Sequence, residues 1–512
     1  MNLSGKGAVM SKKKVRNPLI KRIPKELIGD WKKYLVVFLF LVLTIGFVSG
    51  MYVANESMLK SAADGVKEYK QEDGHFELKK QADDALLSAI ETGEKADVKQ
   101  YYLDEAKKKL DKKFPKKFKS TFDEKFKSKF DAQFSAQVKQ TLVAQGMDEQ
   151  TVAAMLPTAV KQAKADGTYK NAYDKAYSSA YTDAYDKAYD EAWKKAQDKI
   201  EDKYADAEEK YELNDPDFKA TKTTVYENFF RNEEEDYNND GKKDGTIRVF
   251  PQTEDINLAC LLKGSFPQTK DEIAIDRMHA DNVGVTVGDT ITISGETYKI
   301  VGLLAYVNYS TLHEKTTDLM FDALKFDVAM VTPEGFDRLH KSVHYTYAWK
   351  YENEPEDDAQ EKIQSDNFMS ALLTQVVVAD NELEDYTPKY GNPAINFATD
   401  DMGSDKAMGG VLLDILIVII AFIFAVTISN TIAKEASAIG TLRASGYTKG
   451  ELIRHYLSMP VIVTLLAAIV GNILGYTVFK NVVVSMYYNS YSLPTYYTIW
   501  NPDAFFKTTI IP

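Results

Sequence analysis

Three long apolar runs interrupt an otherwise polar chain. The first extends from Tyr34 to Val53, 20 residues without a charge, and at 1.5 Å per residue it matches a hydrocarbon core of about 30 Å. The other two extend from about residue 411 to 432 and from about 459 to 478. A cleaved signal peptide would have a shorter apolar core, followed by a small-residue cleavage site. We therefore predict three membrane-spanning helices, at 34–53, 411–432 and 459–478.

Basic residues before the first run set the expected topology. Residues 1–33 carry ten Lys and Arg against two acidic residues, and the positive-inside rule places such a segment in the cytoplasm. Within it, NPLIKRIPKELIGDWKKYL alternates apolar and basic residues at near-helical spacing, which is typical of an amphipathic helix on the inner membrane surface. With three spans, residues 54–410 and 479–512 are then expected outside and residues 433–458 inside.

Small and polar residues interrupt the second and third runs. Ala467, Gly471 and Gly475 recur about one helical turn apart. Small residues let membrane helices approach closely, so we predict a packing face there rather than a lipid-facing one. Polar residues in or near the spans are either functional groups or hydrogen-bonding partners between helices, and the sequence leaves both open for Asp414, Asn430 and Asn472.

Two segments of the outer region repeat an aromatic residue every fourth position. Phe recurs from Phe114 to Phe134, and Tyr recurs from Tyr169 to Tyr189, with Lys and Asp between the rings. This spacing predicts two long helices with one aromatic face and one solvated face. A short third helix between them would allow an antiparallel hairpin that packs Phe against Tyr. A ligand- or glycan-binding aromatic surface is the alternative interpretation.

Short β-rich segments flank this helical insertion, which covers residues 105–218. We predict one helix at 82–91 and strands at 74–78, 97–103, 223–230, 246–250, 272–275, 289–293 and 296–307. The segments indicate an α+β domain with a core of residues 60–105 and 220–400. The expected fold is thus an α-helical membrane protein with three spans and a large α+β extracytoplasmic domain that carries a long helical insertion.

Composition removes several functional classes. The chain of 512 residues has 63 Lys and Arg against 75 Asp and Glu, a net charge of −12, which argues against nucleic-acid binding. Its one cysteine, Cys260, excludes a disulfide-framed scaffold. The sequence contains no P-loop, no H-E-x-x-H and no G-x-S-x-G motif, and its six histidines suggest no metal or nucleophile site. We expect no enzymatic activity and no cofactor bound by this chain itself.

One acidic run resembles the first half of a calcium loop. Its candidate ligands have the right spacing, but Ile247 stands where a bidentate Glu is required. Asn, Asp and Gly are equally typical of a tight hairpin loop, and we favour that interpretation over a weak calcium site at Asp236, Asn238, Asp240 and Asp244.

The segment between the second and third runs reads KEASAIGTLRASGY, from Lys434 to Tyr447. It resembles the FtsX-like permease domain of ABC transporters, in which an acidic residue precedes "IGTLRA-G" and a span follows. Outside, DEIAID at 271–276 and VGDT at 287–290 are similar to the core of the MacB-like extracytoplasmic domain. The family has one span, a large outer domain and three more spans. The sequence ends at Ile510, Ile511 and Pro512 as an apolar run begins, so we expect truncation before a fourth span.

The resemblance implies partners. Such permeases work as dimers, with a second copy or a homologous half, and their cytoplasmic loop docks on an ATPase subunit that binds ATP and Mg. A short helix here would expose Ile439, Leu442 and Tyr447 as apolar anchors; in an ordinary loop the glycines would only cap a helix. The residues expected to couple to the ATPase are Glu435, Ile439, Gly440, Leu442, Arg443, Ala444, Gly446 and Tyr447.

The expected function is that of a permease subunit in a bacterial plasma membrane. It would export a peptide, lipid or lipoprotein, or transmit force to an external partner such as a cell-wall hydrolase. The single cysteine and the Lys- and Tyr-rich composition favour a Gram-positive host. The alternative is a membrane-anchored receptor or adhesin with a helical stalk, which would need no ATPase.

Overall fold

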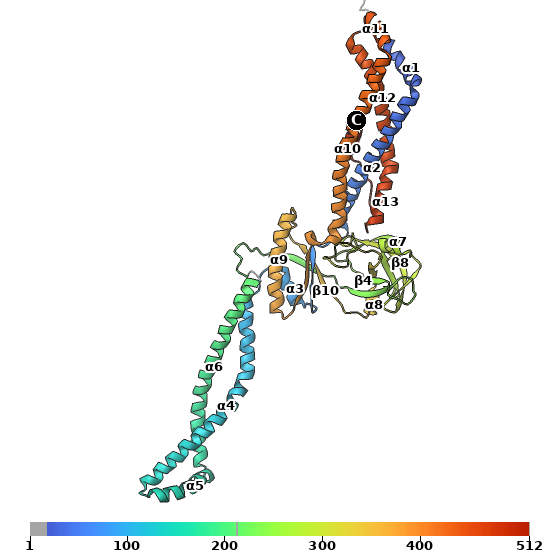
Figure 1. Cartoon of the computed structure of the whole chain (residues 1–512). Coiled ribbons are helices and arrows are strands. Elements are labelled where there is room, and N and C mark those ends of the chain that lie inside the picture. Colours follow the sequence, from blue (N-terminus) through green and yellow to red (C-terminus); the bar gives the residue numbers. More distant parts are fainter. Residues whose placement is uncertain (1–17, 211–212, 511–512) are drawn as a thin grey trace, which may run out of the picture. The chain divides into compact units, whose positions relative to one another are not determined.

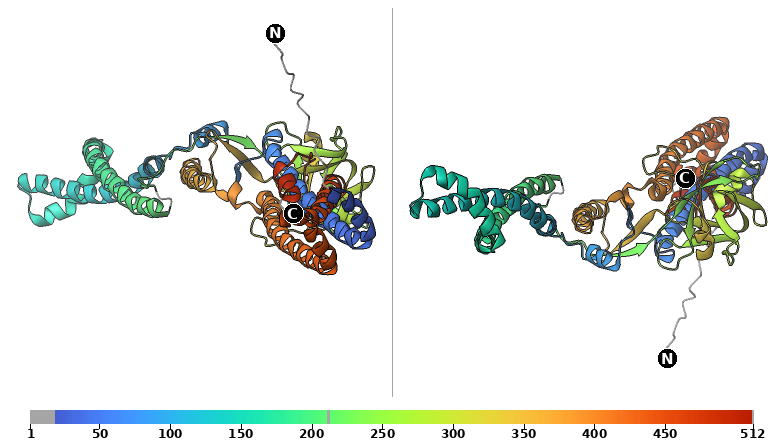
Figure 2. Two further views of the ribbon diagram at one scale, coloured as in Figure 1. Left: turned by 90° about the horizontal axis from the view of Figure 1, so that it is seen from above. Right: turned by 90° about the horizontal axis from the view of Figure 1, so that it is seen from below.

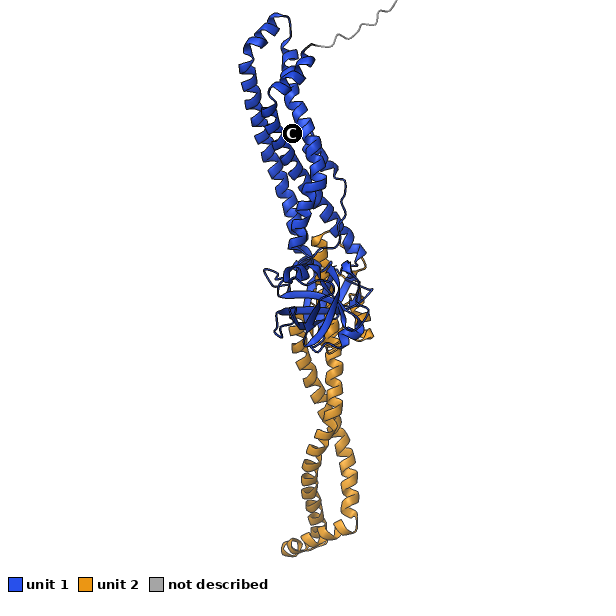
Figure 3. Ribbon diagram, turned by 90° about the vertical axis from the view of Figure 1, so that its right-hand side faces the viewer, with its two compact units in different colours: residues 1–78, 225–350, 384–512 blue, residues 79–224, 351–383 orange. Residues whose placement is uncertain are grey.

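The computed structural model describes residues 18–210 and 213–510 (Figure 1). Most of the predicted basic N-terminus, residues 1–17, and the end of the expected fourth apolar run, residues 511–512, lie outside the described residues. The chain divides into two compact units (Figure 3). The first comprises residues 1–78, 225–350 and 384–512, and the second comprises residues 79–224 and 351–383.

A bundle of long helices forms one part of the first unit. By length and apolar composition, three described helices can cross a membrane: α2 (Trp31–Glu68), α10 (Pro393–Lys434) and the continuous helix Lys449–Ser490. The last consists of α12 (Lys449–Leu474), a π-helical turn (Gly475–Phe479) and α13 (Lys480–Ser490). α2 contacts both α10 and α12, and the three lie side by side (Figure 2). The predicted three-span architecture is confirmed.

Shorter helices complete the bundle, and α10 and α12 begin at residues whose side chains cap them. α1 (Arg22–Gly29) precedes α2, α11 (Ala436–Ala444) joins α10 to α12, and α14 (Pro502–Thr509) follows α13. Asn392 caps α10 with a proline at the first helical position, and Thr448 and Glu451 form a capping box on α12. α2 and α10 extend well beyond the apolar runs, by 15 residues after Val53 in α2 and 18 before Val411 in α10.

The α+β part of the first unit is built on a seven-stranded sheet of order β5-β8-β6-β9-β4-β3-β7. β7 also pairs with β8, so six of the strands form a closed ring. Its core consists of fully buried aliphatic residues, including Ile247, Ile273, Ile291 and Ile300. The elements are β3 (Arg231–Asp236), β4 (Gly245–Pro251), β5 (Ala259–Gly264), β6 (Glu272–Asp276), α7 (Arg277–Val283), β7 (Thr290–Ile293), β8 (Glu296–Tyr306), β9 (Phe326–Val331) and α8 (Pro333–Asp337).

A smaller sheet carries the segments that enter and leave the helical bundle. Its order is β11-β1-β10-β2. β1 pairs antiparallel with β10, and Phe76, Tyr347 and Trp349 are fully buried on it. Its strands are β1 (Gly74–Leu78), β2 (Thr223–Glu227), β10 (Tyr345–Tyr351) and β11 (Leu383–Pro388), and a short 3-10 helix, η2 (Lys389–Gly391), leads from β11 to α10.

The second unit contains the predicted aromatic hairpin. Phe rings of α4 (Val98–Ala144) stack on one another at 5.4–5.9 Å between centroids and meet Tyr rings of α6 (Thr168–Lys210) edge to face at 5.1–5.5 Å. α5 (Glu149–Ala165) connects the two helices. The rings therefore pack helix on helix, as predicted, rather than forming an open ligand surface.

The remaining helices of this unit are α3 (Asp84–Glu91) and α9 (Asp358–Val378), which contact each other. The predicted strand at 97–103 is wrong, because α4 begins at Val98. The Asp97 carboxylate accepts a hydrogen bond from the backbone N–H of Gln100 at 2.8 Å and so caps the helix. The cap and the long helical periodicity that follows it outweigh the β propensity of Tyr101 and Tyr102.

Candidate functional site

The segment that joins α10 to α11 is tied to the neighbouring helices by one carboxylate. Glu435 accepts a hydrogen bond from the Tyr456 hydroxyl of α12 at 2.6 Å, and Arg22 of α1 lies 3.4 Å from it. In α1, Glu26 also pairs with Arg22 at 2.6 Å and with His455 of α12 at 3.1 Å. Glu435, one of the residues expected to couple to the ATPase, thus links the start of α11 to α1 and α12.

α11 itself presents its side chains outward. None of its nine residues, all of them described, is buried. Ile439 and Leu442 are half-buried, as is Tyr447 just after the helix. Gly440 has open space around its Cα, and Gly446 ends the helix with φ +94°, a left-handed conformation that favours glycine. Arg443 and Ala444 are exposed. A short helix without buried residues therefore joins α10 to α12, with three half-buried apolar or aromatic side chains on it or just after it.

The small residues of the third apolar run lie against the first span. A Cβ atom on Gly471 would lie 2.9 Å from Ile45, and one on Gly475 would lie 2.8 Å from Ser49. Ala467 is fully buried in the same interface. The partner face is made by Gly46 and Gly50 of α2, whose added Cβ atoms would meet Phe479 at 2.8 and 2.6 Å. The Gly46-x-x-x-Gly50 spacing is visible in the sequence and could have identified this second half of the contact.

Asn472 is the centre of a buried polar network between the same helices. Its side-chain oxygen accepts hydrogen bonds from Ser49 of α2 at 2.8 Å and from Thr508 of α14 at 2.9 Å. Of the two interpretations left open for this residue, the structure supports hydrogen bonding between helices. Asp414 and Asn430 are exposed on α10.

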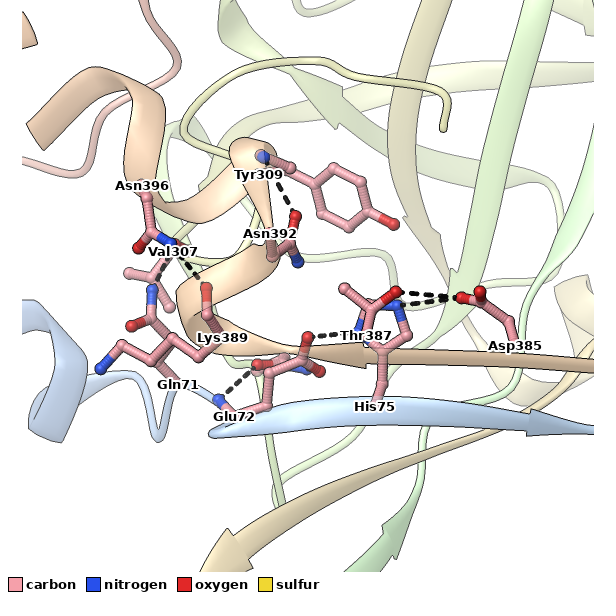
Figure 4. A network of polar contacts seen from close by, with 12 residues as sticks. Gln71, Glu72, His75, Val307, Tyr309, Asp385, Thr387, Lys389, Asn392 and Asn396 are labelled. Atoms are coloured by element: carbon pink, nitrogen blue, oxygen red, sulfur yellow. Dashed lines mark hydrogen bonds and ion pairs between the residues drawn. The ribbon is translucent and has the colours of Figure 1, made fainter. Parts of the chain in front are cut away.

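The residues that follow α2 are fixed to the sheet domains by buried polar contacts (Figure 4). Glu72 is fully buried and accepts a hydrogen bond from the Asn257 side chain at 2.6 Å, while its own backbone N–H donates to Asn257 at 3.0 Å. The Gln71 side chain donates to the carbonyl of Val307 at 2.5 Å. The chain leaving the first span is thereby anchored to the seven-stranded sheet domain.

The residues that precede α10 join the same network. The Lys389 N–H donates to the carbonyl of Asp73 at 3.0 Å, and the Asn396 side chain donates to the carbonyl of Lys389 at 2.5 Å. The carbonyl of Ala394, in the first turn of α10, accepts a hydrogen bond from Ser310 at 2.8 Å. The ends of α2 and α10 and the two sheets thus share one polar junction. We define this polar junction as residues 69–75 and 385–396 together with their hydrogen-bond partners. The sequence does not predict it, because no short motif marks these residues.

The junction predicts a pH-dependent stability. Burial lowers the pKa of His75, but Glu72, 2.6 Å away, and Asp385 raise it more, so the pKa lies above the usual value. A raised pKa stabilises the fold below the unfolded pKa of about 6.5, and this contribution is lost as pH rises through the folded value. We expect His75→Gln to lower the melting temperature most at about pH 6 and progressively less at higher pH. Differential scanning fluorimetry over a pH series measures this.

The matched control for this pH series is His340→Gln at an exposed histidine. It should leave the pH dependence of the melting temperature as it is in the wild type. A His75→Gln variant whose deficit stays constant with pH would contradict the predicted role of the histidine charge.

The acidic run considered for calcium is the hairpin loop between β3 and β4. The Asp236 carboxylate accepts hydrogen bonds from the backbone N–H groups of Asp240 and Gly241 at 3.1 and 2.8 Å. The Asp240 carboxylate accepts a hydrogen bond from the backbone N–H of Lys242. The Asn238 side-chain oxygen accepts one from the backbone N–H of Asp240. Asp244 lies at the end of the loop, where its N–H donates to the carbonyl of Glu235. These contacts are the turn chemistry of the favoured interpretation.

Comparisons with known proteins agree with the motif at 434–447. Residues 410–510 match the family model of the FtsX-like permease C-terminal domain. No curated protein sequence matches the chain. Among solved structures, the chain is similar to the periplasmic region of MacB from Actinobacillus actinomycetemcomitans, with 9% identity and a TM-score of 0.20 over 34% of this chain and 75% of that one. It is also similar to the extracellular domain of the noncanonic ABC-type transporter YknZ from Gram-positive bacteria, with 13% identity and a TM-score of 0.20 over 31% and 80%. Residues 410–510 are thus similar to the C-terminal domain of the FtsX-like permeases.

Proposed function

We propose that this chain is the membrane subunit of an ABC-type system and that α11 is its docking site for a separate ATPase subunit. The observation that carries the proposal is the short exposed helix inside the permease-matched segment. In this proposal Ile439, Leu442 and Tyr447 supply an apolar patch for the partner, and Arg443 supplies a charge beside it. Such a patch suits a partner protein because buried apolar anchors contribute most of the energy of small interfaces.

The proposed orientation places α11 in the cytoplasm. Residues 1–33 carry the basic excess that favours the inner side. α1 contacts α12, and Arg22 lies beside Glu435, so the described end of this segment and α11 share one end of the bundle. The segment between the second and third spans also carries positive charges at that end, on Lys434, Arg443, Lys449 and Arg454. The sheet domains and the aromatic hairpin would then lie outside a bacterial plasma membrane.

The proposed mechanism is transmission of movement from α11 to the outer domain. Glu435 links α11 to α1 and α12, and at the far end the polar junction fixes α2 and α10 to the sheets. Displacement of α11 by an ATPase would therefore tilt the spans and carry the outer sheets with them. Such a movement of the sheets could drive either export of a peptide, lipid or lipoprotein, or force transmission to a cell-wall partner.

The system we propose has further components. ATP and Mg would be bound by the ATPase partner and not by this chain. A second permease copy or a homologous half would complete a dimer within the membrane lipid. The Lys-rich aromatic hairpin would face a large external partner, because its rings are used for its own packing and leave a charged outer surface.

Affinity purification of the full-length chain in mild detergent tests the ATPase proposal. We expect an ATPase subunit to co-purify with the wild type and its recovery to fall roughly tenfold or more with Leu442→Asp, because a charge would be buried in the apolar patch. Ser437→Asp is the matched control, since it adds the same charge to another face of α11. If the wild type recovers no ATPase, the permease proposal fails and the anchored receptor or adhesin becomes the better interpretation.

A further inference from the structure

We propose that the seven-stranded sheet domain contains a zinc site formed by Glu235 of β3, His279 of α7 and Asp327 of β9. All three side chains are completely buried. One ligand atom of each lies within 4.8 Å of those of the other two. Imidazole nitrogen and carboxylate oxygen are ordinary zinc ligands, and the fold brings together three of them from separate elements.

His279 is oriented as a metal ligand would be. Its Nδ1 lies 2.8 Å from the carbonyl oxygen of Ala323. A carbonyl only accepts, so Nδ1 carries the proton and the lone pair of the neutral ring is on Nε2. Nε2 lies 3.3 Å from Oε1 of Glu235. Two ligands at about 2.1 Å from a tetrahedral zinc ion would be roughly 3.4 Å apart, so this pair already has the required separation.

Apart from the 3.3 Å contact between Nε2 of His279 and Oε1 of Glu235, four atoms of this cluster lack hydrogen-bond partners among the described residues. They are both carboxylate oxygens of Glu235, Oδ2 of Asp327 and Nε2 of His279. Burying such groups without a partner is costly. Without a metal, charge balance would require an imidazolium at His279 beside Glu235, because no hydrogen bond joins the carboxyl groups of Glu235 and Asp327 in the described structure. A divalent cation with two carboxylates and a neutral histidine is electrically balanced.

A second layer of contacts holds the ligands in place. Oδ1 of Asp327 accepts hydrogen bonds from the N–H groups of Val328 at 2.7 Å and Asp276 at 3.2 Å, which leaves Oδ2 free to bind. The Asp276 carboxylate accepts from the N–H groups of Met278 and His279 and from the Ser492 hydroxyl. Asp276 therefore fixes the first turn of α7, and with it the position of His279.

The ligand set favours zinc over other common cations. Calcium and magnesium take six or more oxygen ligands or retain several waters, whereas this site is buried and includes an imidazole. Three protein ligands leave one position for water in a tetrahedral zinc site. Glu235 also lies beside a surface cavity lined by Asp236 and Gly241, while its own carboxylate is completely buried.

Zinc content of the full-length chain tests the site. The protein, purified in detergent through a tag without histidine, is dialysed against Zn²⁺, freed of excess metal and analysed by inductively coupled plasma mass spectrometry. We expect one zinc ion per chain in the wild type and in the control His340→Gln, and loss of that ion in His279→Gln and Glu235→Gln. Folded wild type without stoichiometric zinc, or His279→Gln that retains it, would overturn the proposal.

Two measurements on the wild type keep the test independent of variant folding. Co²⁺ in place of Zn²⁺ should give the visible absorption of a tetrahedral site with nitrogen and oxygen ligands. A chelator should lower the melting temperature, and added Zn²⁺ should restore it, because a bound metal stabilises the folded state. No cobalt spectrum together with a chelator-insensitive melting temperature would mean that the three side chains are balanced by protons alone.

Discussion

Replacement of Gly50 by leucine is expected to separate α2 from α13 and to lower the thermal stability of the bundle more than any other single change on this interface. A Cβ atom on Gly50 would lie 2.6 Å from Cβ of Phe479 and 2.8 Å from the backbone nitrogen of Lys480. Both distances are below van der Waals contact, and backbone atoms cannot rotate out of the way. Overpacking by small groups costs about 1–3 kcal/mol, and leucine adds three carbons beyond alanine.

The measurement is the fraction of monodisperse protein left after heating, followed by fluorescence-detected size-exclusion chromatography in detergent. We expect the midpoint to fall on the order of 5 °C or more. Gly403→Leu is the matched control, because that glycine of α10 also lies within a helix and an added Cβ would meet no described atom within 4 Å. Equal midpoints for the two variants would contradict the close approach of α2 and α13.

The membrane part of the fold was predictable because its signals are long and local. A 20-residue run without charge leaves few alternatives in water or lipid. The helix contact was predicted from one side only: Gly471 and Gly475 were identified, whereas Gly46 and Gly50 were read as part of an uninterrupted span. The π-helical turn at Gly475–Phe479 has no sequence signal in the apolar pattern, since it arises where Phe479 fits against the two glycines of α2.

The sheet domain was predicted less completely for two physical reasons. β3 reads RNEEED, which has neither alternating polarity nor β propensity. It is a strand because β4 and β7 pair with its two edges, and two of its glutamates are buried by that pairing. β9 is buried along its whole length, so it lacks the alternation expected of a half-exposed strand.

The candidate sites also differ in how far apart their residues lie in the sequence. The α11 residues form one continuous motif and could be named from the sequence. The polar junction joins Glu72 to Asn257 across 185 residues, and the proposed zinc ligands are 44 and 48 residues apart (279 − 235 and 327 − 279). Neither spacing corresponds to a local motif, so only the tertiary fold reveals that these polar side chains share a buried environment.

Replacement of Phe122 by alanine is expected to open the aromatic hairpin locally. Phe122 stacks on Phe118 and Phe126 and meets Tyr177 and Tyr181 edge to face. Its loss removes four ring contacts at the centre of the ladder. Aromatic pairs contribute about 0.5–1.5 kcal/mol each beyond burial, and Phe→Ala in a full core costs about 3–5 kcal/mol. Because Phe122 is half-buried, we expect a cost of roughly 2–4 kcal/mol.

Limited trypsin digestion of the full-length chain measures this opening, because Lys residues follow the rings along α4 and α6. Cleavage within residues 112–129 should accelerate by roughly 30-fold or more if the hairpin opens and closes faster than it is cut. Ser128→Ala, on the exposed side of α4, should cleave at the wild-type rate. An unchanged rate in Phe122→Ala would mean that helix propensity alone holds the hairpin closed. The four-residue aromatic repeat would then serve some purpose other than stability.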